Sequence, residues 1–492
     1  MTAVSVKPLK LLNTRSQKKE VFKGHYENKV SIYCCGPTVY GYTHVGNARA
    51  ALTLDLVSRI FKLAHYQIEA ARNYTDIDDK IIEASKRENK TSHEIAEFYQ
   101  KAYDEELSLL KALTPKFRPK ATESVEDIVE FIQSLEKKQM AYSVQTEFGT
   151  DVYFRVSKFK KYGALSKRKL DDMIAGSRID IDEKKEHPAD FALWKAAKPE
   201  EPSWKSPWGN GRPGWHIECS AMIYKIFKSD LDIHMGGLDL IFPHHENEIA
   251  QSESLTEKAL ATYWLHNGMI EVGKEKMSKS IGNILRTADF IRDYGAETLR
   301  LLVFQQHYRS PMDLSEESIL RAEALIDKLY LAKLTAKTIK PTADSAVTPL
   351  ETKLPSELES LSAKIEESLL DDFNSAKALG QILSALRASH RENTASCWQV
   401  WAQSLPFLNS VFGILEEDPA QALKHSRERR LKRMQITETQ AAEIDQKLIE
   451  RENLRKQKNF EASDQIRKDL EKEGIQIMDG PDGSAWAVSK EK

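Results

Sequence analysis

The sequence predicts an α/β fold with a doubly wound parallel sheet, an insertion in that sheet, a helical bundle and a small C-terminal α+β domain. Three observations carry this prediction. Strand-like and helix-like apolar spacings alternate between Val30 and Leu113. A Pro- and Gly-rich loop over residues 199–214 precedes a second α/β stretch. The apolar spacing after the Lys276 loop is helical.

The first predicted unit is a strand, a tight turn and a helix. Val30, Ile32 and Cys34 alternate as in a strand, and apolar residues at helical spacing follow at Leu52, Leu56, Val57, Ile60 and Phe61. A helix that begins after a Gly-containing turn presents free backbone N–H groups and a partial positive charge, so a phosphate group can bind there. We interpret this unit as the first half of a Rossmann-like nucleotide-binding sheet.

The stretch from Pro115 to about residue 207 is predicted to be an insertion. It contains a helical pattern over residues 125–135, a strand-like segment at 152–154 and a charged loop at 180–185. The loop over 199–214 is expected to lead back into the second half of the sheet.

The C-terminal half is predicted to be mainly helical. We expect long amphipathic helices within residues 315–339 and 354–415. A last small unit over 448–486 is expected to hold one charged helix, a strand at 474–478 and a turn at 480–483.

Composition excludes several classes of protein. The 492 residues carry 72 Lys and Arg against 74 Asp and Glu, so any nucleic-acid-binding surface must be a local patch. Four cysteines, two of them adjacent, do not make a secreted disulfide framework. The N-terminal residues lack a signal-peptide apolar core, and no apolar run reaches membrane-spanning length. We therefore expect a cytoplasmic protein with no membrane partner.

Five short strings point to one family. In order along the chain they are CGPTVY with HVGN (35–47), NYTDIDDK (73–80), GWHIECSAM (214–222), FPHHENE (242–248) and KMSKS (276–280). Together they resemble the motifs of the cysteinyl-tRNA synthetase family, among the class I aminoacyl-tRNA synthetases, over nearly the whole chain. One position departs from the class-wide pattern, because Asn47 stands where the class has His. An amide can donate a hydrogen bond but cannot titrate, so we assign the main phosphate contact to His44.

The resemblance implies a function and a domain order. The function is ATP-dependent ligation of L-cysteine to tRNA(Cys) through a cysteinyl-adenylate, by an enzyme expected to be a monomer. The two halves of the catalytic domain would be 1–114 and 208–272, with 115–207 as a connective insertion. Residues 273–320 would be the KMSKS loop and stem-contact region, 321–423 the helical bundle and 424–492 a basic anticodon-binding domain.

The resemblance also implies one zinc ion per chain, bound by Cys35, Cys219, His244 and Glu248. The residue types agree with this on physical grounds. Pro243 suits the first position of a helix, from which His244 and Glu248, at i and i+4, would project as two ligands. A soft zinc–thiolate bond would separate cysteine from serine, whereas shape alone provides only about 1–3 kcal/mol. A purely structural zinc stays open as an alternative.

The remaining site residues are implied by the resemblance as well. His44, Lys276 and Lys279 would stabilise the phosphates of ATP together with Mg²⁺. The ATP site would be completed by Gly36, Thr38, Gly46, Asn47 and Asp239, the last near the ribose hydroxyls, while Trp215 and His234 would line the cysteine pocket.

The tRNA is expected to bind near the C-terminus. Basic residues crowd residues 424–433, and more follow at 451–458. Such runs are usually solvated faces. The resemblance places the anticodon arm here, and we expect phosphate contacts from this run and base stacking on an exposed Trp486.

Two other functions stay open. The cysteine ligase of mycothiol synthesis resembles this catalytic core but lacks the C-terminal unit, so residues 424–486 argue against it. A non-catalytic synthetase-like protein that binds cysteine or tRNA is the second alternative. The intact His44, Lys276 and Lys279, together with all four zinc positions, argue against that one.

Overall fold

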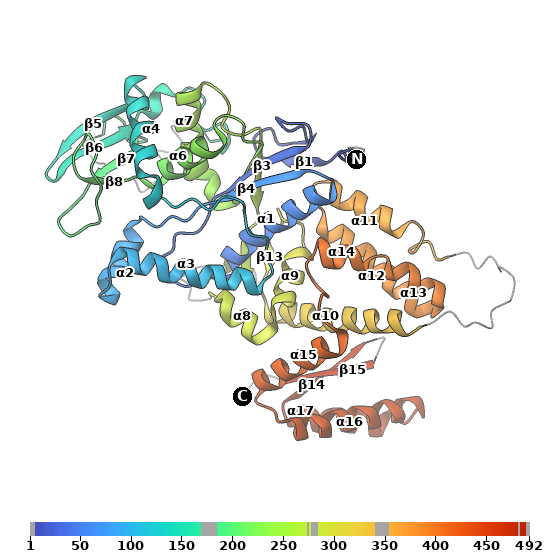
Figure 1. The fold of residues 1–492 in the computed structure, drawn as a ribbon. Helices are drawn as coiled ribbons and strands as arrows, with labels where there is room; N and C mark the ends of the chain where they lie inside the picture. Colours follow the sequence, from blue (N-terminus) through green and yellow to red (C-terminus); the bar gives the residue numbers. More distant parts are fainter. Residues whose placement is uncertain are drawn as a thin grey trace.

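The computed structural model describes residues 5–168, 185–272, 275–276, 284–339, 354–480 and 483–488. At its centre lies a four-stranded parallel sheet in the order β10-β9-β3-β4 (Figure 1). Its strands are β3 (Lys29–Cys34), β4 (Gln67–Arg72), β9 (Ile233–Gly237) and β10 (Tyr263–Asn267). The chain order reverses between β3 and β9, which is where doubly wound sheets bind ligands at the carboxyl ends of their strands. The predicted α/β fold is confirmed.

Helices cover both faces of this sheet because the side chains of its strands alternate. Val30 and Ile32 of β3 pack in one core with α1, whereas Tyr33 packs in another core with Met222 of α6. The helices of the α/β part are α1 (Val45–Leu63), α2 (Asp79–Glu88), α3 (Ser92–Leu109), α6 (Trp215–Phe227) and α7 (Glu246–Thr256).

The insertion forms a second, antiparallel sheet beside α4, α6 and α7 (Figure 1). Helix α4 (Val125–Lys137) and strand β6 (Gly149–Phe154) lie where the sequence predicts them. The segment 199–214 is not only a loop, because β8 within it pairs with β7 and completes the sheet. Most of the charged loop at 180–185 lies outside the described residues. The other strands are β5 (Ala141–Thr146), β7 (Phe191–Ala196) and β8 (Gly211–Pro213).

Two small sheets flank the central one. A hairpin of β1 (Lys10–Asn13) and β2 (Lys18–Val21) lies at the N-terminus. Beyond β10, a three-stranded sheet is made of β11 (Ile270–Val272), β12 (Glu275–Lys276) and β13 (Met312–Asp313).

The helical region follows as predicted, but its second predicted segment, 354–415, contains four helices. Turns interrupt the amphipathic pattern there, for example at Asn393, which ends α12 in the left-handed conformation. The helices are α8 (Thr287–Tyr294), α9 (Ala296–Phe304), α10 (Glu316–Thr338), α11 (Leu361–Leu370), α12 (Ser375–Glu392), α13 (Ala395–Ala402) and α14 (Leu405–Ser410).

Helix α15 (Pro419–Met434) leads to a C-terminal unit of α16 (Glu438–Lys456), α17 (Phe460–Lys472), β14 (Ile475–Gly480) and β15 (Gly483–Val488) (Figure 1). The expectation of one charged helix in a unit that begins at residue 448 is wrong, because that residue lies inside α16 and α17 follows. The expectation of an exposed Trp486 is also wrong. Trp486 is 8% exposed, packs among the apolar residues of the unit and donates its Nε1–H to Asp445 at 2.8 Å.

The predicted basic surface at 424–433 is corrected in part, because Lys424 and Lys432 are exposed but three arginines of the run are in ion pairs. Arg427 pairs with Asp445 of α16 at 2.8 Å, Arg430 with Asp327 of α10 at 2.5 Å, and Arg433 with Glu323 of α10 at 2.8 Å. These three arginines therefore hold α15 between its neighbours. None of the described helices is both long and apolar enough to cross a membrane.

Candidate active site and metal centre

A cavity of about 410 Å³ lies at the carboxyl ends of the four parallel strands. Its wall includes the turns after β3 and β9 and the start of α1. The predicted site residues that line it are Cys35, Gly36, Thr38, His44, Gly46, Asn47, Trp215 and Asp239. Residues far apart in the sequence thus meet at the position where a doubly wound sheet binds its ligand.

His44 and Asn47 cap the N-terminus of α1 at the wall of this cavity. His44 Nδ1 accepts from the Gly46 N–H at 3.1 Å, and Asn47 Oδ1 accepts from the His44 N–H at 3.1 Å. This is a reciprocal capping box. In a neutral imidazole that accepts at Nδ1, the proton is on Nε2, where it can be donated to a phosphate. The amide oxygen of Asn47 therefore has a structural role, because it accepts the hydrogen bond that completes this cap.

The described chain on the two sides of residues 277–283 leads to the cavity and to the start of α1. On one side, β12 pairs with β11, whose first residue, Ile270, lines the cavity. On the other side, Arg286 forms an antiparallel bridge with His44, and the Val45 N–H donates to the Leu285 carbonyl at 3.1 Å. The side chain of Lys276 and all of Lys279 lie outside the described residues, so their roles stay predictions.

The four predicted zinc ligands come together at one edge of the cavity. Cys35 Sγ lies 3.9 Å from Cys219 Sγ and 3.5 Å from Glu248 Oε1, and His244 Nε2 lies 2.9 Å from the same Glu248 oxygen. Tetrahedral zinc bonds of about 2.0–2.3 Å place ligand atoms roughly 3.3–3.8 Å apart. The donor types and spacing of Cys35, Cys219, His244 and Glu248 therefore fit a metal ion.

Helix geometry accounts for two of these ligands in a way that differs from the prediction. Pro243 is not the first residue of the helix, because it lies in a short irregular turn at Ile241–His245 and α7 begins at Glu246. His244 and Glu248 nevertheless meet across one turn of the chain.

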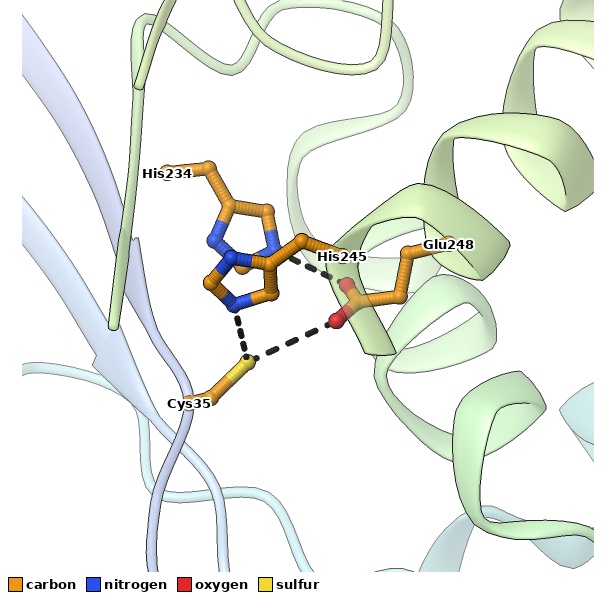
Figure 2. Close-up of side chains that lie close together, drawn as sticks. All are labelled: Cys35, His234, His245 and Glu248. Carbon is orange, nitrogen blue, oxygen red and sulfur yellow. Dashed lines mark hydrogen bonds and ion pairs between the residues drawn. The ribbon is translucent and has the colours of Figure 1, made fainter. Parts of the chain in front are cut away.

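A second group of four side chains shares two of these residues. Figure 2 shows Cys35, His234, His245 and Glu248 pointing toward one another, and their ligand atoms also lie within 4.8 Å. His245 Nε2 lies 3.4 Å from Cys35 Sγ, and His234 Nε2 lies 2.8 Å from Glu248 Oε2. The two carboxylate oxygens of Glu248 thus have different surroundings. Its Oε1 faces Cys35 and His244, whereas Oε2 is held by His234.

Burial and charge determine how this cluster ionises. Hydrogen bonding to Cys35 lowers the pKa of Cys219 to about 6, whereas burial raises the pKa of the Cys35 thiol. Burial alone would lower the pKa of His244, but the charge of Glu248 and hydrogen bonds to Cys219 and Glu248 outweigh it and raise the pKa to about 10. Despite its burial, Glu248 has a pKa well below its usual range, because the charges of His234 and His244 stabilise the carboxylate.

The two predicted pocket residues lie on different sides of the cluster. Trp215, the first residue of α6, lines the cavity and stacks on the ring of His244, with ring centres 4.3 Å apart. His234 is fully buried behind Glu248, where its ring stacks on Trp264 at 4.6 Å. Their assignment to a cysteine pocket stays a prediction.

Sequence reasoning did not identify two of the residues at this site. His245 follows His244 directly, and the adjacent pair of histidines was a usable signal for a second imidazole at the cluster. Arg72 lines the cavity at the carboxyl end of β4. A charged residue that ends an otherwise mostly apolar parallel strand marks the ligand-binding edge of such a sheet.

Comparisons with known proteins agree with this arrangement. Residues 21–324 match the family model described as tRNA synthetases class I (C) catalytic domain. The chain is 42% identical over 488 residues to a cysteine–tRNA ligase of Geobacter sp. (strain M21), covering 98% of this chain and 100% of that one. It is 41% identical to a cysteine–tRNA ligase of Thermodesulfovibrio yellowstonii, covering 98% and 99% of the two chains.

Solved structures show the same fold at low sequence identity. The Mycobacterium tuberculosis methionyl-tRNA synthetase, in complex with methionyl-adenylate, superposes with a TM-score of 0.57 at 14% identity. The match covers 82% of this chain and 88% of that chain.

Proposed function

The chain belongs to the cysteine–tRNA ligase family of class I tRNA synthetases, and from this membership we propose how its residues carry out the reaction. The enzyme joins L-cysteine to tRNA at the expense of ATP. The observation that carries our residue assignments is that one cavity is lined both by the capped N-terminus of α1 and by Cys35 of the metal cluster. The amino acid and the triphosphate can therefore meet there.

The first step forms cysteinyl-adenylate. The carboxylate of cysteine attacks the α-phosphorus of ATP, and pyrophosphate leaves. This displacement needs positioning and charge stabilisation. The Nε2–H of His44, at the positive end of the α1 dipole, would bind phosphate oxygens. Lys276 and Lys279, with Mg²⁺, would neutralise the charge that develops on pyrophosphate, and Asp239 would accept from the ribose hydroxyls.

The second step transfers the cysteinyl group to a ribose hydroxyl at the end of the tRNA, and AMP leaves. The backbone around Gly36 and Thr38 lies on the cavity wall beside Cys35, where it can contact the adenylate. The chain that follows residues 277–283 lies beside the helix terminus that would bind the phosphates, because Arg286 bridges His44.

We propose that Cys35, Cys219, His244 and Glu248 hold one zinc ion. Bound zinc would supply a soft Lewis acid that binds the substrate thiolate and does not bind a serine hydroxyl comparably at neutral pH. His234 would orient Glu248 through its Oε2, as outer hydrogen bonds commonly orient metal ligands. Trp215, stacked on His244, would cover the methylene group of the substrate.

Charging of tRNA tests this function directly. The purified protein should transfer radiolabelled L-cysteine to tRNA(Cys) in the presence of ATP, and should show cysteine-dependent ATP–pyrophosphate exchange without tRNA. Transfer of cysteine to an amino sugar without any charging of tRNA would instead support the mycothiol-type ligase. Cysteine or tRNA binding with neither reaction would support a non-catalytic relative.

The metal ligands are tested by Cys219→Ser. Metal analysis of the wild-type protein should give about one zinc per chain. The variant should lose most of that zinc and its cysteine activation together, since a serine hydroxyl is a poor zinc ligand at neutral pH. Cys397→Ser is the matched control, because Cys397 is a buried thiol in the helical region and belongs to neither group of metal-binding side chains. Full zinc with unimpaired activation in Cys219→Ser would rule out this ligand set.

A further inference from the structure

A buried arginine on the cavity wall has no role in the mechanism described so far. Arg72 is the last residue of β4 and is 4% exposed. Its guanidinium carbon lies 5.2 Å from the centre of the Tyr103 ring, and both residues line the cavity. Arg72 Nε has no hydrogen-bond partner among the described residues. A buried guanidinium that forms no ion pair and leaves Nε without a hydrogen-bond partner carries a desolvation cost, which an anionic ligand in the cavity would offset.

The neighbouring carboxylate of Asp104 does not form an ion pair with Arg72. Asp104 lies near Arg72, but its Oδ1 accepts from the Tyr74 hydroxyl at 2.6 Å and its Oδ2 from Arg118 at 3.4 Å. Among the described residues, Arg72 forms no ion pair with Asp104 or with another carboxylate. Other buried arginines differ from it. Arg300, for example, pairs with Asp55 at 2.6 Å and donates to the carbonyls of Leu110 and Phe412.

We propose that Arg72 binds an oxyanion of the substrates, and that this oxyanion is the α-carboxylate of the bound cysteine. The inference rests on the proposed function, since it takes cysteine to occupy this cavity. An arginine can bind a carboxylate through two parallel N–H···O bonds, and such a pair fixes orientation as well as position.

Position favours the carboxylate of the amino acid over the phosphates of ATP. Arg72 is paired in register with Cys34, next to the metal ligand Cys35. A methyl group on Gly36 would lie 3.4 Å from Arg72 Cγ. Among the groups assigned to ATP, Gly36 lies beside Arg72, but the start of α1 and Asp239 after β9, which would bind the phosphates and the ribose, lie elsewhere on the wall. Cysteine is short, so a molecule held by its thiol at Cys35 keeps its carboxylate close to the end of β4.

The direct test is binding of two ligands to zinc-loaded protein by calorimetry. L-Cysteine carries a thiol, an amine and a carboxylate, whereas cysteamine lacks only the carboxylate. Wild type should bind cysteine more tightly than cysteamine. In Arg72→Met the dissociation constant of cysteine should rise by about 10- to 100-fold, as expected for the loss of hydrogen bonds to a charged group. The constant for cysteamine should stay unchanged, and Arg72→Lys should lie between the two proteins.

Stability and ATP binding separate this role from the alternatives. Arg72→Met should melt close to wild type, because the guanidinium forms no ion pair among the described residues and Met can still pack on the Tyr103 ring. Arg300→Met, the matched control, should melt lower without changing the ratio of the cysteine and cysteamine constants. A higher KM for ATP with an unchanged ratio would show that Arg72 binds phosphate. Equal weakening of both thiols, or a lower melting temperature alone, would make the residue structural.

Failure of the inference can be told apart from failure of the proposed function. Binding is measured without turnover, so it reports on Arg72 even if the wild-type protein shows no cysteine-dependent exchange. A wild-type protein that binds cysteine no more tightly than cysteamine would overturn the carboxylate assignment in either case.

Discussion

At the scale of single residues, Glu248 connects the metal cluster to the buried side chains behind it. Its Oε1 faces Cys35 and His244, and its Oε2 contacts His234 at 2.8 Å. One carboxylate can therefore serve the metal with one oxygen while the other fixes its orientation. Without metal, the charge of Glu248 and hydrogen bonds from His244 to Cys219 and Glu248 stabilise the protonated form of His244, which is why the pKa of that imidazole rises to about 10.

This ionisation predicts that zinc binding releases protons. At pH 7 the metal-free cluster holds one proton on His244, whose pKa is about 10, and one on Cys35, whose pKa is raised by burial. Cys219, with a pKa of about 6, is already mostly thiolate. Because zinc ligands must be deprotonated, binding at pH 7 should release about two protons per ion.

Calorimetric titration of metal-free protein with zinc, in two buffers of different ionisation enthalpy, measures this number. As the pH falls through 6, Cys219 takes up a proton as well, so zinc affinity should fall. The same affinity at pH 5.5 and pH 7.5, with no proton release, would show that these side chains are not the ligands.

At the scale of elements, α15 is a helix with two occupied faces. Arg430 and Arg433 reach the acidic side of α10, and Arg433 also donates to the Asp293 carbonyl at the end of α8. Arg427 and Leu431 contact the C-terminal unit instead. Three arginines of the basic run are thus part of an internal connection, and α15 joins the C-terminal unit to α8 and α10.

The contribution of the buried ion pair between Glu323 and Arg433 can be tested with two substitutions on α10. Glu323 of α10 is 3% exposed and accepts from Arg433, so Glu323→Gln leaves a poorly compensated arginine. Breaking a buried pair in this way should cost on the order of 3 kcal/mol. Hydrogen exchange of the α15 amides should report the loss as faster opening.

Glu317→Gln provides the control on the same helix. Glu317 pairs with Arg321, but both side chains are mostly exposed, so this change should alter stability by less than about 0.5 kcal/mol. Equal effects of the two substitutions would mean that the pair between α10 and α15 does not hold the helix.

The sequence predicts the positions of helices and strands better than it predicts which residues their side chains contact. Helix α4 and strand β6 follow from the spacing of their apolar residues, because that spacing is a local property. The partners of Arg430 and Trp486 lie 103 and 41 residues away along the chain. A run of charges or a terminal tryptophan contains no information about such partners, so the sequence predicts exposed groups at both places.

At the scale of the whole molecule, the metal cluster depends on the return of the chain to the central sheet after the insertion. Cys35 follows β3 in the first half of the sheet, while Cys219, His244 and Glu248 come from the second half, after an intervening insertion. Family motifs allow these four residues to be grouped from the sequence. Arg72 and His245 are not grouped with them, because the motif strings say nothing about the distances between residues that end neighbouring strands.

The division of labour along the chain predicts the outcome of two truncations. A protein that ends after Gln435 keeps α15 and loses only the C-terminal unit. It should retain cysteine-dependent pyrophosphate exchange, while its KM for tRNA in charging should rise. The salt dependence of tRNA binding should also flatten, by about 0.7–0.9 in the log–log slope for each tRNA phosphate that the shortened protein no longer binds.

A protein that ends after Asp418 provides the comparison. It also loses α15 and leaves the buried Glu323 without Arg433, so it should melt at a lower temperature than the longer truncation. If the protein ending after Gln435 charged tRNA as well as the full chain at every salt concentration, the C-terminal unit would have no part in tRNA binding.

The central claim is that the metal cluster selects the thiol of cysteine. Its most direct test is ATP–pyrophosphate exchange with L-cysteine and with L-serine, measured on zinc-loaded and on metal-depleted protein. With zinc, cysteine should exceed serine by far more than the roughly 200-fold that pocket shape alone can give. Metal depletion should abolish cysteine activation, and zinc should restore it. A metal-depleted protein that kept both its rate and its preference for cysteine would contradict the account.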